Sequence, residues 1–271
     1  MDKFDSSILK NLYKPAPGSH KGQNGKLLLI GGSKLFHAAS LWSLEVASRI
    51  VDMVFYASVP ENNELVQKAK EEFRNGIVIP RSKIDSYMEE VDCVLIGPGL
   101  PRKEGEEAGD DDTKKLTERL LEEYPDKKWV IDGGSLQTVS REDLPENSIL
   151  TPHKNEFKTL FDLEPTAENV SKMAKKYDVV ILLKGEKDIV CSASQCVEIV
   201  GGNAGMTKGG TGDVLAGLVA ALYCKNSAFL AACAASYISK KAGESLFEKV
   251  GTSFNASDLA SEIPSVMRKM A

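Results

Sequence analysis

Short apolar runs alternate with longer segments of mixed polarity over most of the 271-residue chain. The runs predict buried strands, and the segments between them, such as Ala38–Ile50 and Glu61–Phe73, have the spacing of helices. Continuous apolar strands separated by helices are typical of a parallel sheet that is covered by helices on both faces. The predicted strands are Lys26–Ile30, Met53–Ala57, Cys93–Ile96, Trp129–Ile131, Ser148–Leu150 and Val179–Leu183.

Beyond Asp213 the pattern changes, and only helices are expected. No internal repeat and no linker rich in Pro, Gly or Ser divides the chain, so we expect one α/β domain over residues 1–271. The low-complexity patch Arg102–Lys115 is expected to be a solvated loop. The helices predicted after Asp213 are Val214–Tyr223, Ala228–Phe247 and Ala256–Met267.

Nearly every predicted strand is followed directly by small or polar residues. In open parallel sheets, ligands bind beyond the carboxyl ends of the strands. We therefore expect these clusters to converge on one site. They are Gly31-Gly32-Ser33, Gly97-Pro98-Gly99, Asp132-Gly133-Gly134, Thr151-Pro152-His153 and Lys184-Gly185.

The segment 201–217, GGNAGMTKGGTGDVLAG, is the most informative part of the sequence. A glycine-rich loop that opens a helix presents backbone N–H groups at the positive end of the helix dipole, where a phosphate or oxyanion binds. Asp213 is expected in the first turn of this helix. A carboxylate there would repel a phosphate, but it can take a proton from a hydroxyl beside the phosphate. The alternative is a flexible connector with Asp213 as the N-cap of the helix.

Three other clusters each allow two interpretations. Lys184-Gly185 is either a nucleotide contact or a plain turn into a strand at Asp188–Cys191. Gly97-Pro98-Gly99 is either a tight turn around a ligand or a structural turn. Before the first strand, Lys21 either meets a phosphate or is an ordinary exposed lysine.

The segment that begins at Thr151 also has a structural and a chemical interpretation. Thr151 is expected to cap the next helix, with Pro152 at its first position and Glu156 in its first turn. The chemical interpretation adds Glu156 as a carboxylate that holds a hydrated Mg²⁺, with His153 near the substrate.

Composition and missing motifs exclude several classes of protein. A net charge of −5 without a basic stripe argues against a nucleic-acid partner. The first residues lack the features of a signal or transit peptide, and no apolar stretch is long enough to span a membrane, so we expect a cytoplasmic protein. Gly31-Gly32-Ser33 lacks the GxGxxG spacing, and the chain has no Walker lysine and no GxSxG, so neither hydride transfer on a Rossmann fold nor acyl chemistry is expected.

The five cysteines form no CxxC pair. We expect them to be small buried residues in a reducing compartment rather than a disulfide framework or a zinc site. They are Cys93, Cys191, Cys196, Cys224 and Cys233.

With these elements in place, the chain resembles the NAD(P)H-hydrate dehydratases, which are nucleotide-dependent repair enzymes with a ribokinase-like fold. The resemblance extends from His20 to Pro264. Its last element is highly specific, and the others are individually weak but follow in the family order. The elements are HKGxxG at 20–25, GGS at 31–33, GPG at 97–99, PHxxE at 152–156, KG at 184–185 and GNAGMTKGGTGDVLAG at 202–217.

The resemblance implies a hydro-lyase that dehydrates the S epimer of hydrated NADH or NADPH, with ADP (ATP in some members) as co-substrate and with AMP and phosphate as products. Asp213 would deprotonate the ring hydroxyl, while the N–H groups of Gly210–Gly212 would hold the charge of the transferring phosphoryl group. Mg²⁺ would bridge phosphate oxygens and reach Glu156 through water. A homo-oligomer, a tetramer, is also implied; the helix Ala228–Phe247 is a candidate contact, although core packing explains its small residues as well.

The same resemblance assigns two sets of ligand contacts. The hydrated dinucleotide would contact Ala39, Gly99, His153 and Asp213. The adenine nucleotide would contact Lys184, Gly185, Glu186, Lys187, Asp188, Asn203, Ala204, Gly205, Met206, Thr207, Lys208, Gly209, Gly210, Thr211 and Gly212.

The chain departs from the family pattern at Ala38, Asn155, Val51-Asp52-Met53 and Asp132-Gly133-Gly134. These departures concern the substrate contacts rather than the nucleotide site. Two other functions remain open. A ribokinase-like kinase of a small hydroxymethyl compound, such as a thiamin precursor, would share the anion site and the base. A nucleotide-sensing module without turnover would leave Asp213 without a task.

Overall fold

The computed structural model describes residues 1–68, 76–102 and 112–270. Within these ranges, ten strands form one sheet in the order β1-β10-β9-β8-β7-β6-β5-β2-β3-β4. All neighbouring strands are parallel except the two pairs that involve β9. The strands are β1 (Asp2–Lys3), β2 (Lys26–Ile30), β3 (Met53–Ser58), β4 (Ile77–Pro80), β5 (Cys93–Ile96), β6 (Lys128–Ile131), β7 (Ile149–Leu150), β8 (Val180–Leu183), β9 (Asp188–Cys191) and β10 (Cys196–Ile199).

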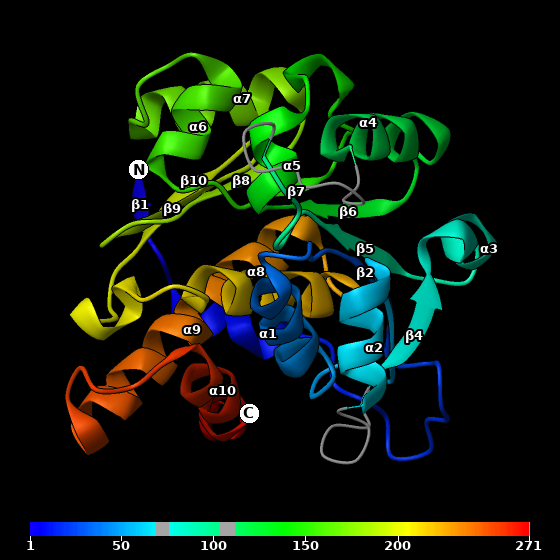
Figure 1. Ribbon diagram of the computed structural model, residues 1–271. Coiled ribbons are helices and arrows are strands. Elements are labelled where there is room, and N and C mark those ends of the chain that lie inside the picture. Colours follow the sequence, from blue (N-terminus) through cyan, green and yellow to red (C-terminus); the bar gives the residue numbers. More distant parts are fainter. Residues whose placement is uncertain (69–75, 103–111, 271) are drawn as a thin grey trace.

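Helices cover both faces of this sheet, as Figure 1 shows. On one face lie α1 (His37–Ala47), α2 (Pro60–Lys68), α8 (Thr211–Tyr223), α9 (Ala228–Val250) and α10 (Ala256–Met270). On the other face lie α3 (Ile84–Met88), α4 (Thr113–Glu123), α5 (Gly133–Thr138), α6 (Lys154–Phe161) and α7 (Ala167–Tyr177). The predicted α/β class, with a mostly parallel sheet between two helical layers, is confirmed.

The strand β2 shows why its sequence is a continuous apolar run. Leu27 and Leu29 pack into the core on the α1 and α8 side, whereas Leu28 and Ile30 pack into the core on the opposite side. All four side chains are fully buried. Successive side chains of a strand point to opposite faces, so a strand with a helical layer on each side has no polar face.

The predicted strands and helices agree with the structure to within a few residues at their ends, except that the end of the predicted helix Glu61–Phe73 lies outside the described residues. The expected loop at Arg102–Lys115 is partly wrong. Residues 103–111 lie outside the described part of the chain, but Thr113–Lys115 form the first turn of α4. Asp112 caps this helix by accepting the backbone N–H of Lys115 at 3.1 Å. Charged residues at the end of this segment therefore form the N-cap and the first turn of a helix, which the sequence pattern did not predict.

The expectation for the cysteines is wrong for one pair. Cys191 and Cys196 form a disulfide, because β9 and β10 are a hairpin whose register places these two residues directly opposite each other. Cys93, Cys224 and Cys233 are buried free thiols, as expected. A spacing of five residues says nothing by itself about pairing, and the turn that brings the two sulfurs together was not predicted.

The long helix α9 is explained by packing within the chain. The small residues Ala231, Ala232, Ala234 and Ala235 have no exposed surface and pack in the core that α9 shares with α8 and α10. Of the two interpretations of this stretch, core packing accounts for these small residues, and a subunit contact through α9 stays a prediction.

The order of the strands reverses between β2 and β5. The chain continues from β2 to β3 and β4 in one direction, and from β5 to β6, β7 and β8 in the other. At such a reversal the chain leaves the two strands in opposite directions, and in open α/β sheets ligands bind at this point, beyond the carboxyl ends of the strands. Here the N–H of Gly32 donates to the carbonyl oxygen of Pro98 at 2.7 Å, which joins the two glycine-rich turns.

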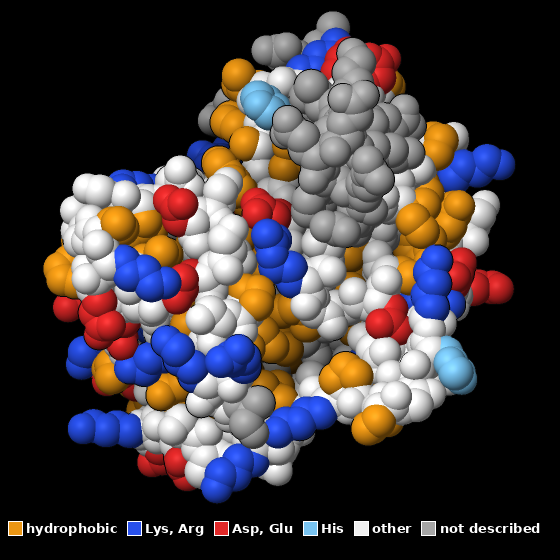
Figure 2. Space-filling view, turned by 90° about the horizontal axis from the view of Figure 1, so that it is seen from below, with side chains coloured by type: hydrophobic (Ala, Val, Ile, Leu, Met, Phe, Trp, Pro, Cys, Tyr) orange, Lys and Arg blue, Asp and Glu red, His pale blue; other side chains and the backbone are white. Residues whose placement is uncertain are grey.

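On the face shown in Figure 2, Lys and Arg side chains lie beside Asp and Glu side chains, and hydrophobic side chains are visible between them. Among the described helices, none combines the length and the apolar character that crossing a bilayer requires.

Candidate active site

The glycine-rich loop lies at the carboxyl edge of the sheet, where it connects β10 to α8. Gly210 is the N-cap of α8 and has a φ of +94°. A Cβ atom at Gly210 would lie 2.4 Å from the ring of Trp42 in α1, so only glycine fits this turn. The first backbone N–H groups of a helix have no intrahelical acceptors, so the start of α8 is suited to an anion, although the N–H of Thr211 donates to the carbonyl oxygen of Lys208 at 3.4 Å.

Asp213 lies in the first turn of α8 and is not its N-cap, so the alternative of a simple capping residue is wrong. Its carbonyl oxygen accepts the hydroxyl of Ser43 at 2.8 Å, which anchors the start of α8 to α1. Burial, together with the negative charge of Asp132, raises the pKa of Asp213 to about 7, against the opposing effect of Lys184. A carboxylate with this pKa can accept a proton near neutral pH.

Lys184 lies at the centre of a group of carboxylates. Its Nζ is 2.9 Å from Asp132 Oδ1 and 4.0 Å from Glu156 Oε2, and the side chain is only 18% exposed. Burial by itself would lower the pKa of Lys184, but Asp132, Glu156 and, more weakly, Asp213 outweigh it and raise the pKa. Lys184 is therefore a fixed positive charge next to the first turn of α8.

Three strand ends supply this group, as the sequence predicts. Asp132 follows β6, Thr151 follows β7 and Lys184 follows β8. The hydroxyl of Thr151 donates to Asp132 Oδ1 at 2.7 Å. Thr151 was expected to cap α6, and this is wrong: the N-cap is His153, whose Nδ1 accepts the N–H of Glu156 at 3.1 Å. The Thr151 side chain instead holds the carboxylate that pairs with Lys184.

Both carboxylate oxygens of Glu156 are occupied by protein donors. Oε2 accepts the backbone N–H of His153 at 2.8 Å, which completes a capping box, and Oε1 accepts the side-chain amide of Gln137 at 3.1 Å. The ammonium group of Lys184 lies 4.0 Å from Oε2 and already supplies a positive charge next to the Glu156 carboxylate.

These residues do not fit a site that holds Mg²⁺ directly. In the described part of the chain, no three His, Cys, Asp or Glu side chains form a group suited to a metal ion. Mg²⁺ usually keeps several waters and is bound by few protein carboxylates together with substrate phosphates. The contact of Glu156 with Mg²⁺ through water stays a prediction, and we derive no step from the ion.

The residues expected to contact the hydrated dinucleotide lie at the carboxyl side of the sheet, around the ends of β2 and β5 and at the starts of α6 and α8. Gly99 has a φ of +70°, and a Cβ atom there would lie 2.4 Å from the carbonyl oxygen of Phe36 and 3.1 Å from the Cβ of Ala39. A Cβ at Gly97 would lie 1.8 Å from the carbonyl oxygen of Asp132. The GPG turn is therefore wedged between α1 and the turn that carries Asp132, which brings Ala39 and Gly99 together. His153, with its side chain 47% exposed, starts α6 two strands away.

The residues expected to contact the nucleotide surround a separate pocket of about 860 Å³, within the range of small-molecule sites. Among them, Gly205, Lys208, Gly209 and Gly210 do not line it. The Lys208 Nζ instead donates to the carbonyl oxygens of Thr252 and Phe254. The pocket is also lined by residues that sequence reasoning missed, namely Val200, Gly201, Gly202, Leu215, Ser239 and Lys240. The lysine and the serine lie inside α9, where no motif distinguishes them.

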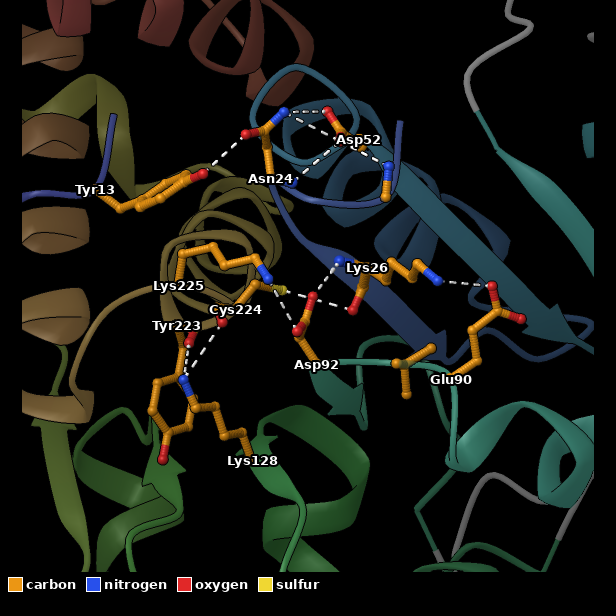
Figure 3. Close-up of polar contacts among 12 residues, drawn as sticks. Tyr13, Asn24, Lys26, Asp52, Glu90, Asp92, Lys128, Tyr223, Cys224 and Lys225 are labelled. Atoms are coloured by element: carbon orange, nitrogen blue, oxygen red, sulfur yellow. Dashed lines mark hydrogen bonds and ion pairs between the residues drawn. The ribbon is translucent and has the colours of Figure 1, made fainter. Parts of the chain in front are cut away.

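The HKGxxG segment lies at the opposite edge of the sheet, before β2. Asp52 accepts the backbone N–H of Gly22 at 2.8 Å and that of Asn24 at 3.1 Å, and the Asn24 side chain bonds to the same carboxylate (Figure 3). Lys21 is exposed there, at the edge away from the glycine-rich loop, so it does not approach the anion site of its own chain. These hydrogen bonds join the HKGxxG segment, which precedes β2, to the residue that precedes β3. We call this group of contacts the clasp.

Known proteins resemble this chain in sequence and in structure. A family model described as NAD(P)H-hydrate dehydratase matches residues 27–265. The bifunctional NAD(P)H-hydrate repair enzyme of Methanocaldococcus jannaschii is 37% identical over 271 residues, which cover 96% of this chain and 51% of that protein. The chain thus spans about half the length of this relative. The ADP-dependent (S)-NAD(P)H-hydrate dehydratase of Cenarchaeum symbiosum is 34% identical over 269 residues, which cover 92% of this chain and 91% of that protein.

A solved structure confirms the fold. The ADP/ATP-dependent NAD(P)H-hydrate dehydratase of Bacillus subtilis, co-crystallised with ATP and Mg²⁺, matches with a TM-score of 0.82 and 21% identity over 100% of this chain and 99% of that one. At this identity the likeness establishes the ribokinase-like α/β fold alone. The family match extends over most of the chain on this fold, and the chain therefore belongs to the NAD(P)H-hydrate dehydratase family.

Proposed function

We propose that this protein dehydrates the S epimer of hydrated NADH or NADPH to the intact dinucleotide, with ADP as co-substrate and with AMP and phosphate as products. The position of Asp213 carries the proposal. It follows Gly212, which lines the large pocket, and its backbone is bonded to Ser43 of α1, the helix that packs against the turns after β2 and β5. We propose that this base lies between the two ligands.

The chemistry explains why a dehydratase would use a nucleotide. Hydroxide is a poor leaving group and phosphate is a good one. Asp213 takes the proton from the ring hydroxyl, whose oxygen attacks the terminal phosphorus of ADP, and the bond from that phosphorus to the bridging oxygen breaks to release AMP. The C–O bond to phosphate then breaks and the neighbouring ring carbon loses a proton to solvent, which restores the C=C bond of the dihydronicotinamide.

The protein supplies electrostatic stabilisation for this transfer. The N–H groups at the start of α8 point toward the phosphoryl charge, and Lys184 adds a fixed positive charge beside them. A Cβ atom at Gly212 would lie 3.4 Å from the Lys184 Nζ, so the lysine lies directly against the first turn. We propose that Glu156 would contact a nucleotide-bound Mg²⁺ through water, and that the ion would supply further charge neutralisation.

The assignment of the ligands follows from the two sites. We propose that ADP occupies the pocket lined by Lys184–Asp188 and 200–207, and that the hydrated dinucleotide lies near Ala39, Gly99 and His153. The relative from C. symbiosum, named as an ADP-dependent dehydratase, supports ADP as the donor. We further propose a cytoplasmic homo-oligomer, a tetramer, which light scattering after size exclusion would test.

One experiment tests the function directly. The protein is mixed with hydrated NADPH, Mg²⁺ and either ADP or ATP, and the absorbance of the restored dihydronicotinamide is followed. We expect recovery with ADP. No recovery with either nucleotide would contradict the proposal. Transfer of phosphate from ATP to a hydroxymethyl thiazole or pyrimidine, without dehydration, would favour the kinase instead.

A further inference from the structure

A buried ion pair lies beneath the large pocket. Lys240 of α9 and Asp188 of β9 are 5% and 4% exposed, and the distance from Nζ to Oδ1 is 3.3 Å. Burying two charges is costly unless they are paired and their remaining hydrogen-bonding capacity is satisfied. The contacts of each partner therefore indicate what the pair does.

Asp188 binds its own loop rather than the interior of the pocket. Its Oδ1 accepts the backbone N–H of Gly185 at 2.9 Å, and its Oδ2 accepts the hydroxyl of Ser236 at 2.7 Å. With Lys240 as a third partner, both oxygens are engaged by the protein. Asp188 lines the pocket, so its expected contact with the nucleotide stays a prediction, and these bonds also make it a support for the turn that follows Lys184.

Lys240 connects the two loops that line the pocket. Its ammonium group donates to the carbonyl oxygens of Glu186 at 3.0 Å and Gly185 at 3.2 Å, and to that of Gly201 at 3.5 Å. The first loop follows β8 and the second follows β10, so the β9–β10 hairpin separates them in sequence. One side chain thus sets the spacing between them.

The same face of α9 continues this support. Ser236, Lys240 and Glu244 are four residues apart and therefore lie one above another on the helix. Glu244 accepts the backbone N–H of Gly202 at 3.1 Å, which adds a second bond to the second loop. One row of side chains on α9 therefore bonds to both loops, with Lys240 reaching each of them and Glu244 reaching the second.

The direction of these bonds matters for an anionic ligand. Carbonyl oxygens carry partial negative charge and would repel a diphosphate if they faced it. Three carbonyl oxygens of the two loops are instead bonded to the Lys240 ammonium group. The ion pair of Lys240 and Asp188 therefore fixes the positions of the two loops and keeps their three carbonyl oxygens bonded to a positive charge.

We propose that Lys240 is a positioning residue for the adenine nucleotide, because with Asp188 and Ser236 it fixes the two loops at the spacing that fits ADP. This inference rests on the proposed function. Its consequence is specific: loss of Lys240 weakens the binding of ADP, whereas the chemistry at Asp213 and the proposed site for the hydrated dinucleotide are left intact.

The test is calorimetric titration of the protein with ADP and Mg²⁺, combined with steady-state kinetics. For Lys240→Met we expect the Kd and KM for ADP to rise about tenfold or more, since hydrogen bonds to a charged group are lost. The kcat at saturating ADP and the KM for the hydrated dinucleotide should change by less than about threefold. A merely structural role would lower the active fraction, and hence kcat, without raising the KM for ADP.

Lys249→Met is the matched control. Lys249 lies on the same helix and pairs with Glu262 of α10, and it does not line the pocket. We expect it to leave the Kd for ADP unchanged. An unchanged Kd in Lys240→Met, or an equal rise in Lys249→Met, would overturn the inference.

If Lys240→Met does not fold, Ser236→Ala tests the same inference. It removes only the hydroxyl that holds Asp188, and we expect the Kd for ADP to rise about threefold; no rise would overturn the inference.

If ADP binding depends on Lys240 but the wild type shows no dehydration, the proposed function fails and the positioning role stands. A wild type that does not bind ADP overturns both.

Discussion

The pKa of Asp213 is set by its burial and by two charged groups near it. Asp213 lies in the first turn of α8, where burial and the charge of Asp132 raise its pKa to about 7, while Lys184 acts in the opposite direction. Without Lys184 the carboxyl would remain protonated at neutral pH, and without the burial it would be too weak a base. The balance between these effects is what makes this residue the candidate base.

Asp213→Asn removes the base and keeps the shape of the side chain. We expect turnover to fall by at least about 100-fold while ADP still binds, because the amide cannot accept the proton. The measurements are the recovery of the dihydronicotinamide and calorimetric titration with ADP. Retained turnover would contradict the assignment of the base, and a parallel loss of ADP binding would assign Asp213 a different role.

The pKa of Asp213 also predicts two pH dependences of opposite sign. Activity should rise as the pH increases through about 7, because the base must be ionised. A carboxyl whose pKa is raised in the folded state stabilises the fold at low pH and loses that contribution as the pH rises through the folded pKa. Asp213→Asn should therefore be more stable than the wild type above pH 7, by up to roughly 4 kcal/mol, and no different at about pH 4. Thermal unfolding across this range checks the sign.

At the scale of elements, the start of α8 depends on the packing of its loop against α1. Gly210 has a positive φ and lies against Trp42, whereas a Cβ at Gly209 would have no neighbour within 4 Å. The two adjacent glycines thus look alike in the sequence but differ in what surrounds them. Only one of them is required by the backbone.

Gly210→Ala should destabilise the protein by about 2 kcal/mol, because the residue must leave its left-handed conformation or displace Trp42. Gly209→Ala is the matched variant, and we expect a change within about 0.5 kcal/mol. Urea unfolding of both variants provides the comparison. Equal stabilities would mean that the loop adapts and that α8 is not held in place by this turn.

For the whole molecule, the sheet separates a chemical edge from a structural one. The glycine-rich loop, Lys184 and Asp213 lie at the carboxyl edge, whereas the clasp of Asp52 with Gly22 and Asn24 lies at the amino edge (Figure 3). There Lys26 donates its N–H to Asp92 at 2.8 Å, and Lys128 donates to carbonyl oxygens at the end of α8. The contacts at the amino edge tie strand starts and a helix end together, and they do not require a ligand.

Hydrogen exchange should report this division. We expect saturating ADP to slow exchange of the amides in 184–188 and 200–212, because these loops line or border the pocket. Peptides that cover 20–26 and 49–53 should exchange at the same rate with and without ADP. Protection confined to the amino edge would place the nucleotide site elsewhere.

Much of the fold follows from local pattern, and the exceptions have physical causes. The strand at Lys26–Ile30 was predicted to the residue because helices bury both of its faces. The strand β4 (Ile77–Pro80) lies at the edge of the sheet and was missed, since its burial is uneven. The helix α4 was missed because its charged face dominates the sequence, and its apolar side shows only when Leu120 and Leu121 pack in the core.

The sequence by itself determined the strand–helix alternation, the glycine-rich turn and the clusters at the strand ends, because each depends on residues that are neighbours in the chain. It could not determine which side chains support these clusters from elsewhere. Thr151 holding Asp132, and Lys240 joining the loops after β8 and β10, arise only when distant segments pack together. Tertiary structure decided these roles, because a buried charge finds its partners in space and not along the sequence.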